Sequence, residues 1–291
     1  MYLQLDINID KCLQEIIDTI WIIQRKWRED HSEQRDVNDA MSHCMLQMMM
    51  TKLRSLQVLA KGLPVLPNKP SSTKIMDIPS LASIVRGIYE MAFIYHNIFI
   101  STENEQERDI LLTLWKIRGF NNRQNLNPPE DIYIKKIDDE KTCIESLRHE
   151  IVLVLDKMNI IQSARKTIER AANKDNSNIS GYKFEKNDSV IVSFKSVPFS
   201  DCEALFSHNY FNALYPYFSF HSHPSYLGVL QFGQMFNAEA DKDMAKTIII
   251  SACICASKFT KDFCDVVADG EKYIKDYTKD FFSSIGLLSM I

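Results

Sequence analysis

The chain has few of the residues that interrupt regular backbone structure. Its 291 residues include only 8 glycines and 9 prolines. All-β sandwiches and glycine-rich nucleotide-binding folds need more turn residues than this. The sequence also lacks a P-loop, a GxGxxG fingerprint and a GxSxG elbow, which argues against P-loop nucleotide chemistry and serine-hydrolase chemistry. The shortage of glycine and proline therefore favours helices.

Neither net charge nor a long apolar run indicates a partner. The 34 basic and 38 acidic residues give a net charge of −4, so there is no clear nucleic-acid signal. The apolar stretch Thr247–Phe259 is too short to cross a bilayer and predicts a buried helix. The first residues carry acids and no cationic region before an apolar core, so we expect no secretory signal. We expect no membrane association and leave the partners unknown, with a homo-oligomer still open.

Cysteine usage indicates a reducing compartment. The 7 cysteines are mostly isolated, and Cys253 and Cys255 form CxC, in place of the CxxC of zinc ribbons and redox sites. We therefore expect reduced, buried thiols and a cytoplasmic protein. No metal site and no cofactor are expected.

Apolar residues recur at spacings of three and four along most of the chain, the period of amphipathic helices. In the clearest example Asp77 and Pro79 begin a helix that continues through Phe99. The same reading predicts helices over 10–27, 37–63, 109–118, 134–173, 238–256 and 258–285, with a short one opened by a capping box at Ser200 and Glu203. Gly62 is expected to end the second helix.

One segment departs from this pattern. Between residues 174 and 197, β-prone runs flank the turn residues Lys186-Asn187-Asp188, which predicts a small β-hairpin near residues 182–195. The predicted fold class is all-α, a multi-helix bundle with this hairpin. We expect a single helical domain over 1–291, with an N-terminal helical hairpin (1–63), a linker (64–78) and a main bundle (79–291) that contains the hairpin insertion at about 174–197.

The most unusual stretch is YPYFSFHSHPS, residues 215–225. If it is helical, Pro216 is compatible with a first-turn position, and Pro224 should end the helix at about His223. Tyr215 and His223 are then expected near opposite ends of one short helix.

Within that helix, Tyr215, Ser219 and His223 are spaced four apart and share a face. His221 and His223 lie at the C-terminus, where the helix dipole favours a protonated imidazole. Two interpretations stay open. A histidine there can act as acid, base or phosphate partner, or His223 caps the helix while Tyr215 and Ser219 form hydrogen bonds inside the bundle.

This stretch resembles a Y-x-x-L-S-x-x-x-H-P-S pattern of a large family of bacterial helical proteins with no established activity. The matching positions are Tyr215, Phe218, Ser219, His223, Pro224 and Ser225. In that family an earlier helix carries an arginine and a glutamate one turn apart, and Arg86 and Glu90 fit this element. Phe218 stands where the pattern has leucine. The resemblance covers about residues 40–260 as an order of elements, and it implies a helical bundle in which Arg86 and Glu90 lie near His223. Without the resemblance, they are an exposed i,i+4 pair in the less favourable order.

Other resemblances fit less well. The HSHP string is similar to the JAB/MPN metalloprotease signature, but Gln231 and Gln234 stand where its serine and aspartate should fall, so a metal-binding carboxylate is missing. HEPN-type ribonucleases use an R-x(4–6)-H spacing, which no arginine and histidine here match; a distant relation with a rearranged site stays open. Asp39–His43 and Glu145–His149 are one turn apart, but no matched di-iron set accompanies them.

Two functions follow as hypotheses. The first is a ligand-binding or regulatory module, such as a host-defence or stress-response component, in which Arg86, Glu90 and His223 form a buried polar cluster and Tyr215, Ser219 and His221 contribute to binding. The second is an enzyme, distantly HEPN-like, that acts on a phosphodiester or nucleotide. In it His223 is the acid/base, Arg86 the phosphate clamp and Glu90 the group that orients them. If these side chains line an open cavity, a functional role is favoured. If they are packed on all sides, a structural role is favoured.

Overall fold

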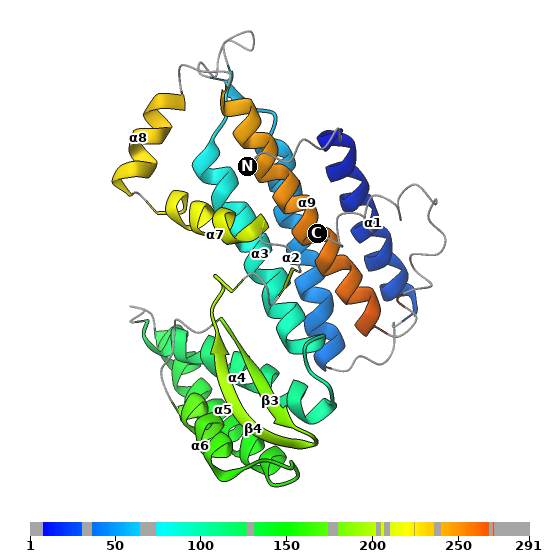
Figure 1. Cartoon of the computed structure of the whole chain (residues 1–291), viewed down its shortest axis with the longest axis vertical. Coiled ribbons are helices and arrows are strands. Elements are labelled where there is room, and N and C mark those ends of the chain that lie inside the picture. Colours follow the sequence, from blue (N-terminus) through cyan, green and yellow to red (C-terminus); the bar gives the residue numbers. More distant parts are fainter. Residues whose placement is uncertain are drawn as a thin grey trace. The chain divides into compact units, whose positions relative to one another are not determined.

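The structure is a computed structural model and describes ten stretches of the chain. These are residues 8–30, 37–64, 74–126, 131–173, 180–201, 205–206, 210–223, 225–235, 240–267 and 270. In chain order the elements are α1 (Ile9–Asp30), α2 (Val37–Leu59), β1 (Leu63–Pro64), β2 (Lys74–Ile75), α3 (Ile78–Phe99), α4 (Glu105–Gln124), α5 (Asp131–Leu155), α6 (Gln162–Asn173), β3 (Gly181–Asn187), β4 (Val190–Val197), α7 (Tyr210–His221), α8 (Tyr226–Met235) and α9 (Ala240–Val266) (Figure 1). The predicted fold class, all-α with a small hairpin, is confirmed.

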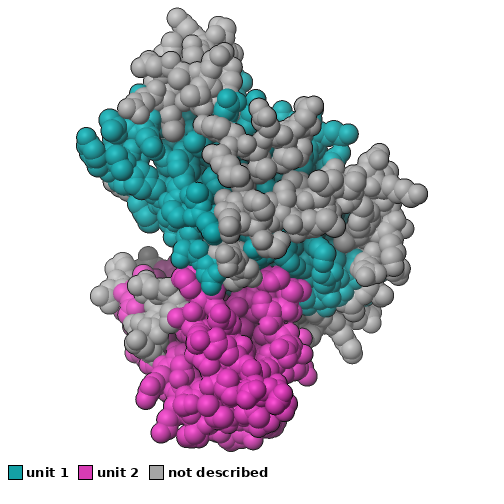
Figure 2. Space-filling view, viewed as in Figure 1, with its two compact units in different colours: residues 1–95, 200–291 teal, residues 96–199 magenta. Residues whose placement is uncertain are grey.

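The described chain divides into two compact units (Figure 2). Unit 1 comprises the described parts of residues 1–95 and 200–291, and unit 2 comprises those of residues 96–199. The expectation of a single domain stays a prediction.

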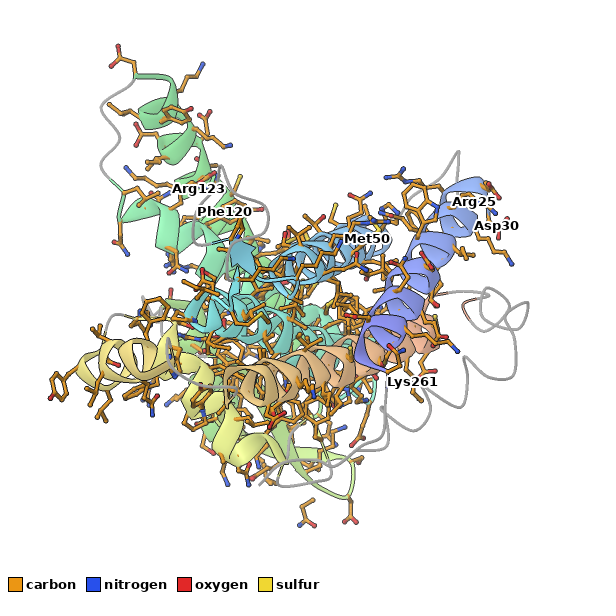
Figure 3. All side chains as sticks on the ribbon, turned by 90° about the horizontal axis from the view of Figure 1, so that it is seen from above. Arg25, Asp30, Met50, Phe120, Arg123 and Lys261 are labelled. Atoms are coloured by element: carbon orange, nitrogen blue, oxygen red, sulfur yellow. The ribbon has the colours of Figure 1, made fainter. Side chains whose placement is uncertain are left out.

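In unit 1 the helices α1, α2 and α9 pack against one another (Figure 1). Their contact surfaces are apolar because isoleucine, leucine and methionine recur at helical spacing, as at Ile16, Ile20 and Leu53, which are almost completely buried. Polar side chains of α1 such as Arg25 and Asp30 lie on the exposed side (Figure 3). The helices expected over 10–27 and 37–63 correspond to α1 and α2, and the division into an N-terminal hairpin, a linker and a main bundle stays a prediction.

Aromatic rings join α3 to the rest of unit 1. Tyr95 packs against Phe259 of α9 with ring centroids 4.9 Å apart. One and a half turns earlier, Tyr89 packs against Phe211 and Tyr215 of α7, with centroids 5.6 and 4.9 Å apart. These large apolar contacts fix the faces that α3 presents to α9 and to α7.

Unit 2 contains α4, α5, α6 and the β3–β4 hairpin. The strands pair antiparallel from Gly181 opposite Val197 to Asn187 opposite Val190, with one register shift after Glu185. Asn97 fixes the hairpin, because its side chain accepts a hydrogen bond from the Tyr182 N–H and donates one to the Tyr182 carbonyl, at 3.1 and 2.7 Å. Lys186 Nζ lies 2.6 Å from both Glu103 and the buried Glu107. The hairpin is therefore attached to the end of α3 and to the start of α4 and the residues just before it, by hydrogen bonds from a side chain and by charged contacts.

Several helix boundaries differ from the predicted ones. The expected helix over 134–173 is two helices, because the intervening chain pairs with β4: Ile191 N–H donates to the Asn159 carbonyl and Ile161 N–H to the Ile191 carbonyl. The predicted helices 238–256 and 258–285 are wrong at their junction, since α9 continues through Ser257. The helix predicted over 109–118 extends over all of α4.

Three elements were not expected, and two expectations lie outside the described chain. The strands β1 and β2 form a short antiparallel pair at the two ends of the predicted linker 64–78. The helix α8 follows the histidine stretch. Glu203 and the residues after 270 lie outside the described part. Gly62 does follow the end of α2, with a φ of 72° that suits glycine.

The cysteine expectation holds in part. Cys12, Cys253, Cys255 and Cys264 are buried, whereas Cys44 and Cys143 are exposed, and none of these six forms a disulfide. Within the described stretches, no helix is both long enough and apolar enough to span a membrane.

We expect the aromatic contact between α3 and α9 to contribute strongly to the stability of unit 1. Replacing the fully buried Phe259 (Phe259→Ala) should lower the free energy of unfolding by about 3–5 kcal/mol, because a ring-sized cavity is left behind. Urea unfolding followed by helical circular dichroism measures this change. Tyr226→Ala is the matched control, because that ring is 80% exposed and its loss should cost less than about 0.5 kcal/mol. Similar losses for both variants would contradict this packing.

Candidate functional site

The first two candidate residues lie on α3. Asp77 begins this helix, since its carboxylate accepts a hydrogen bond from the Ser80 N–H at 3.1 Å. Arg86 and Glu90 are one turn apart, so they lie on the same face. The Arg86 Nε donates to Glu90 Oε1 at 2.7 Å.

The next two come from α7 and the turn after it. This helix begins at Tyr210, so Pro216 lies in its interior and the predicted first-turn position is wrong. Pro216 has no N–H to donate to the carbonyl four residues earlier, yet the helix continues to His221. His223 therefore follows the helix in a turn and does not end it as predicted.

Hydrogen bonds and close contacts connect four of these side chains. The Tyr215 hydroxyl donates to Glu90 Oε1 at 3.0 Å, so that one carboxylate oxygen accepts from both Arg86 and Tyr215. The Arg86 Nη1 lies 3.3 Å from His223 Nε2. The Arg86 guanidinium carbon is also 5.9 Å from the centre of the Tyr215 ring. We call Arg86, Glu90, Tyr215 and His223 the Arg86 cluster.

The Arg86 cluster is partly buried, so the surface-pair interpretation is wrong. The side chains of Arg86 and Glu90 are each 26% exposed. Burial by itself would lower the pKa of Arg86, but the hydrogen bond and charge of Glu90 outweigh it and leave that pKa raised. Burial raises the pKa of Tyr215, the Glu90 charge adds to the rise, and Arg86 opposes it. Arg86 therefore stays cationic and Tyr215 stays a neutral donor.

The Arg86–His223 contact selects one form of the imidazole. A guanidinium can only donate, so a hydrogen bond here requires a lone pair on His223 Nε2. The ring proton is then on Nδ1. The His223 side chain is exposed, so a dissolved molecule can reach it.

The remaining predicted residues, Ser219 and His221, also belong to α7. Ser219, one turn after Tyr215, interacts with the Tyr215 hydroxyl and opposes the rise in its pKa. His221 is not joined to Arg86 or Glu90 by any described contact. Its ring is 5% exposed and packs against Tyr217 with centroids 4.4 Å apart.

A pocket of about 720 Å³ begins at His223. Its walls come from the end of α2, the first turns of α3, the end of α7 and the inner side of α8. The lining residues are Leu59, Asp77, Pro79, Ser80, Ser83, Ile84, His221, Ser222, His223, Gly228, Val229 and Phe232. A volume of this size, with mostly apolar walls and a few polar groups, is typical of small-molecule sites.

Sequence reasoning missed the α8 wall of this pocket. A helix-capping residue in the sequence could have revealed this helix. Ser225 caps α8, because its hydroxyl accepts a hydrogen bond from the Gly228 N–H at 3.0 Å. A side chain at Gly228 would approach the Phe220 carbonyl to 3.4 Å and His221 Nδ1 to 3.9 Å. The tightest contact of such a side chain would be with the capping hydroxyl of Ser225, at 3.0 Å.

The other candidate histidines have structural surroundings. His43 is buried and stacks on Trp27 with centroids 4.3 Å apart. Glu145 forms an ion pair with Arg148. Within the described ranges, no three His, Cys, Asp or Glu side chains are grouped so that they could hold a metal ion.

Comparison of the chain with protein-family models, curated proteins and solved structures finds no match. The assignment of a function therefore depends on the geometry of the site itself.

The shared carboxylate predicts strong coupling between Arg86 and Glu90. In a double-mutant cycle with Arg86→Ala and Glu90→Ala, we expect a coupling energy of about 1–2 kcal/mol, because a half-buried charged hydrogen bond is lost. Urea unfolding of the two single variants and the double variant measures it.

Arg25 and Glu29 on α1 provide the matched control. They have the same order and spacing, but their side chains are 61% and 64% exposed and 3.6 Å apart. Their coupling should not exceed about 0.5 kcal/mol. Equal coupling in both pairs would mean that Arg86 and Glu90 behave as an ordinary surface pair.

Proposed function

We propose that unit 1 is a ligand-binding module that holds a small molecule in the pocket next to the Arg86 cluster. One observation carries this proposal: His223 belongs both to the Arg86 cluster and to the pocket wall. A polar network that served packing alone would need no member at the edge of a cavity.

Each member of the cluster has a role in this proposal. Glu90 holds the Arg86 guanidinium through Nε, and Tyr215 holds the same carboxylate oxygen from α7. Arg86 in turn engages His223 Nε2, which leaves the Nδ1 proton for a ligand. The cluster thus orients one imidazole donor before the ligand arrives, and such preorganisation improves affinity.

Ligand binding in this pocket would also give the module a regulatory role. A ligand that contacts both α3 and α8 binds only when these helices have the right spacing, so binding can stabilise one arrangement over another. As part of this proposal, we expect the chain to belong to the bacterial helical family that it resembles and to act in host defence or stress response.

Replacement of His223 should weaken ligand retention. We expect wild-type protein purified under mild conditions to carry a small molecule that native mass spectrometry detects and solvent extraction releases. Titrated back, that molecule should bind His223→Ala about tenfold more weakly, because one hydrogen bond to the ligand is lost.

The exposed His149 on α5 provides the control, and His149→Ala should bind like the wild type. Circular dichroism checks that both variants are folded. A wild type without any bound molecule, or His223→Ala with unchanged affinity, would count against the module.

An enzyme acting on a phosphodiester or nucleotide is the second candidate. The observation that favours it is the 3.3 Å contact between a guanidinium and an exposed imidazole at the pocket edge. Arg86 would bind the phosphate, Glu90 would orient Arg86, and His223 would transfer the proton.

Turnover of RNA and of nucleoside triphosphates by wild type and His223→Ala tests this candidate. Loss of a proton-transfer group should reduce the rate by about 100-fold or more. Equal rates in the two folded proteins would dismiss His223 as a catalyst.

A further inference from the structure

Two thiols from different helices lie against each other in the interior of unit 1. Cys12 belongs to α1 and Cys253 to α9, and these two helices pack together (Figure 1). The two residues are only 6% and 2% exposed. Their side chains form a hydrogen bond with each other. Both thiols are free, so the contact is a reduced pair that joins the first helix of unit 1 to its last described helix.

This contact distinguishes the pair from an ordinary buried cysteine. A free cysteine often packs as a small hydrophobic side chain, and Cys264 on α9 is of this kind. Burial raises the pKa of Cys264, and within the described residues no other thiol contributes to that rise. Cys12 and Cys253 differ from it because each sulfur has the other within hydrogen-bonding distance. Two sulfurs placed in this way can bond to each other while the two helices stay packed.

The hydrogen bond makes the two thiols chemically unequal. Its effect is to lower the pKa of Cys12, while burial and the charge of Glu15 oppose this fall. The same hydrogen bond, together with burial, raises the pKa of Cys253. Cys253 therefore keeps its proton and donates it to the Cys12 sulfur. Because the thiolate is the nucleophilic form of cysteine, Cys12 is the more reactive member of the pair.

We propose that Cys12 and Cys253 are a reversible oxidation site, which hydrogen peroxide converts into a disulfide between α1 and α9. The site is independent of the ligand pocket. The Cys12 thiolate attacks one peroxide oxygen, the O–O bond breaks, and the departing hydroxide takes up a proton to become water. The resulting sulfenic acid is attacked by the Cys253 sulfur. The S–O bond then breaks, and the departing hydroxide takes the Cys253 proton, so two thiols and one peroxide give one disulfide and two waters.

The burial of the pair selects a small oxidant. Hydrogen peroxide is little larger than water, whereas a disulfide such as oxidised glutathione must bring its own sulfur against the attacking thiolate. A Cys12 side chain that is 6% exposed favours the first over the second. In a reducing environment such a bond is transient, as in proteins that sense oxidants.

Peroxide treatment of the full-length protein tests the site. After incubation with a small molar excess of hydrogen peroxide, free thiols are blocked with N-ethylmaleimide and the digested protein is analysed by mass spectrometry. We expect a cross-linked peptide that contains Cys12 and Cys253, and dithiothreitol should remove it. The thermal midpoint of the oxidised protein should rise by about 5–10 °C, because the disulfide constrains most of the unfolded chain.

Two variants assign the order of the steps. Cys253→Ser should stop at the sulfenic acid of Cys12, which dimedone traps, because no second thiol is left to displace it. Cys12→Ser should give neither a cross-link nor a dimedone adduct at Cys253, whose protonated thiol is a poor nucleophile. Circular dichroism checks that both variants are folded. Cys143→Ser, at an exposed position, and Cys264→Ala, at a buried one, should keep the cross-link and the rise in midpoint.

Three outcomes would overturn the proposal. The first is a folded wild type that forms no Cys12–Cys253 peptide in peroxide, or forms it only in urea. The second is a rise in midpoint that Cys12→Ser shows as fully as the wild type, because another bond would then be responsible. The third is a dimedone adduct at Cys253 of Cys12→Ser with none at Cys12 of Cys253→Ser, which would mean that Cys12 is not the attacking thiol.

Discussion

The candidate site depends on one carboxylate oxygen. Glu90 Oε1 accepts hydrogen bonds from Arg86 on its own helix and from Tyr215 on α7. The second bond joins two helices far apart in the sequence, and the first holds the guanidinium where it reaches His223. A half-buried charge must be paired if it is not to destabilise the fold, so the three side chains are constrained together. Without Glu90, Arg86 and Tyr215 would each lose the hydrogen bond to this shared oxygen.

The apolar contacts next to this carboxylate decide where it lies. Tyr89 precedes Glu90 by one residue and packs against Phe211 and Tyr215. The ring contacts place α7 along α3, and the hydrogen bond then fixes the detailed geometry, because polar bonds are directional whereas apolar contacts are not. The turn after α7 and the cap of α8 follow from that placement. They bring His221, His223 and the α8 side chains around one pocket.

Prediction from the sequence succeeded where the signal is local. The helix start at Asp77, the positive-φ Gly62 that follows α2 and the β-hairpin near 182–195 each follow from residue types within a few positions. It was wrong where a distant partner intervenes. The helix expected over 134–173 is interrupted because residues 159–161 bond to Ile191 of β4, and Pro216 is accommodated inside α7 although proline disfavours that position.

The sequence by itself determined which side chains were available and that most of them lie on helices, because helical periodicity and capping act over one or two turns. The i,i+4 spacing also placed Arg86 beside Glu90. Only the tertiary structure decided that Tyr215 and His223 complete that pair, that His221 is separated from it, and that a pocket lies next to them. These features join residues more than 120 positions apart, and their geometry is set by how the apolar faces of several helices fit together.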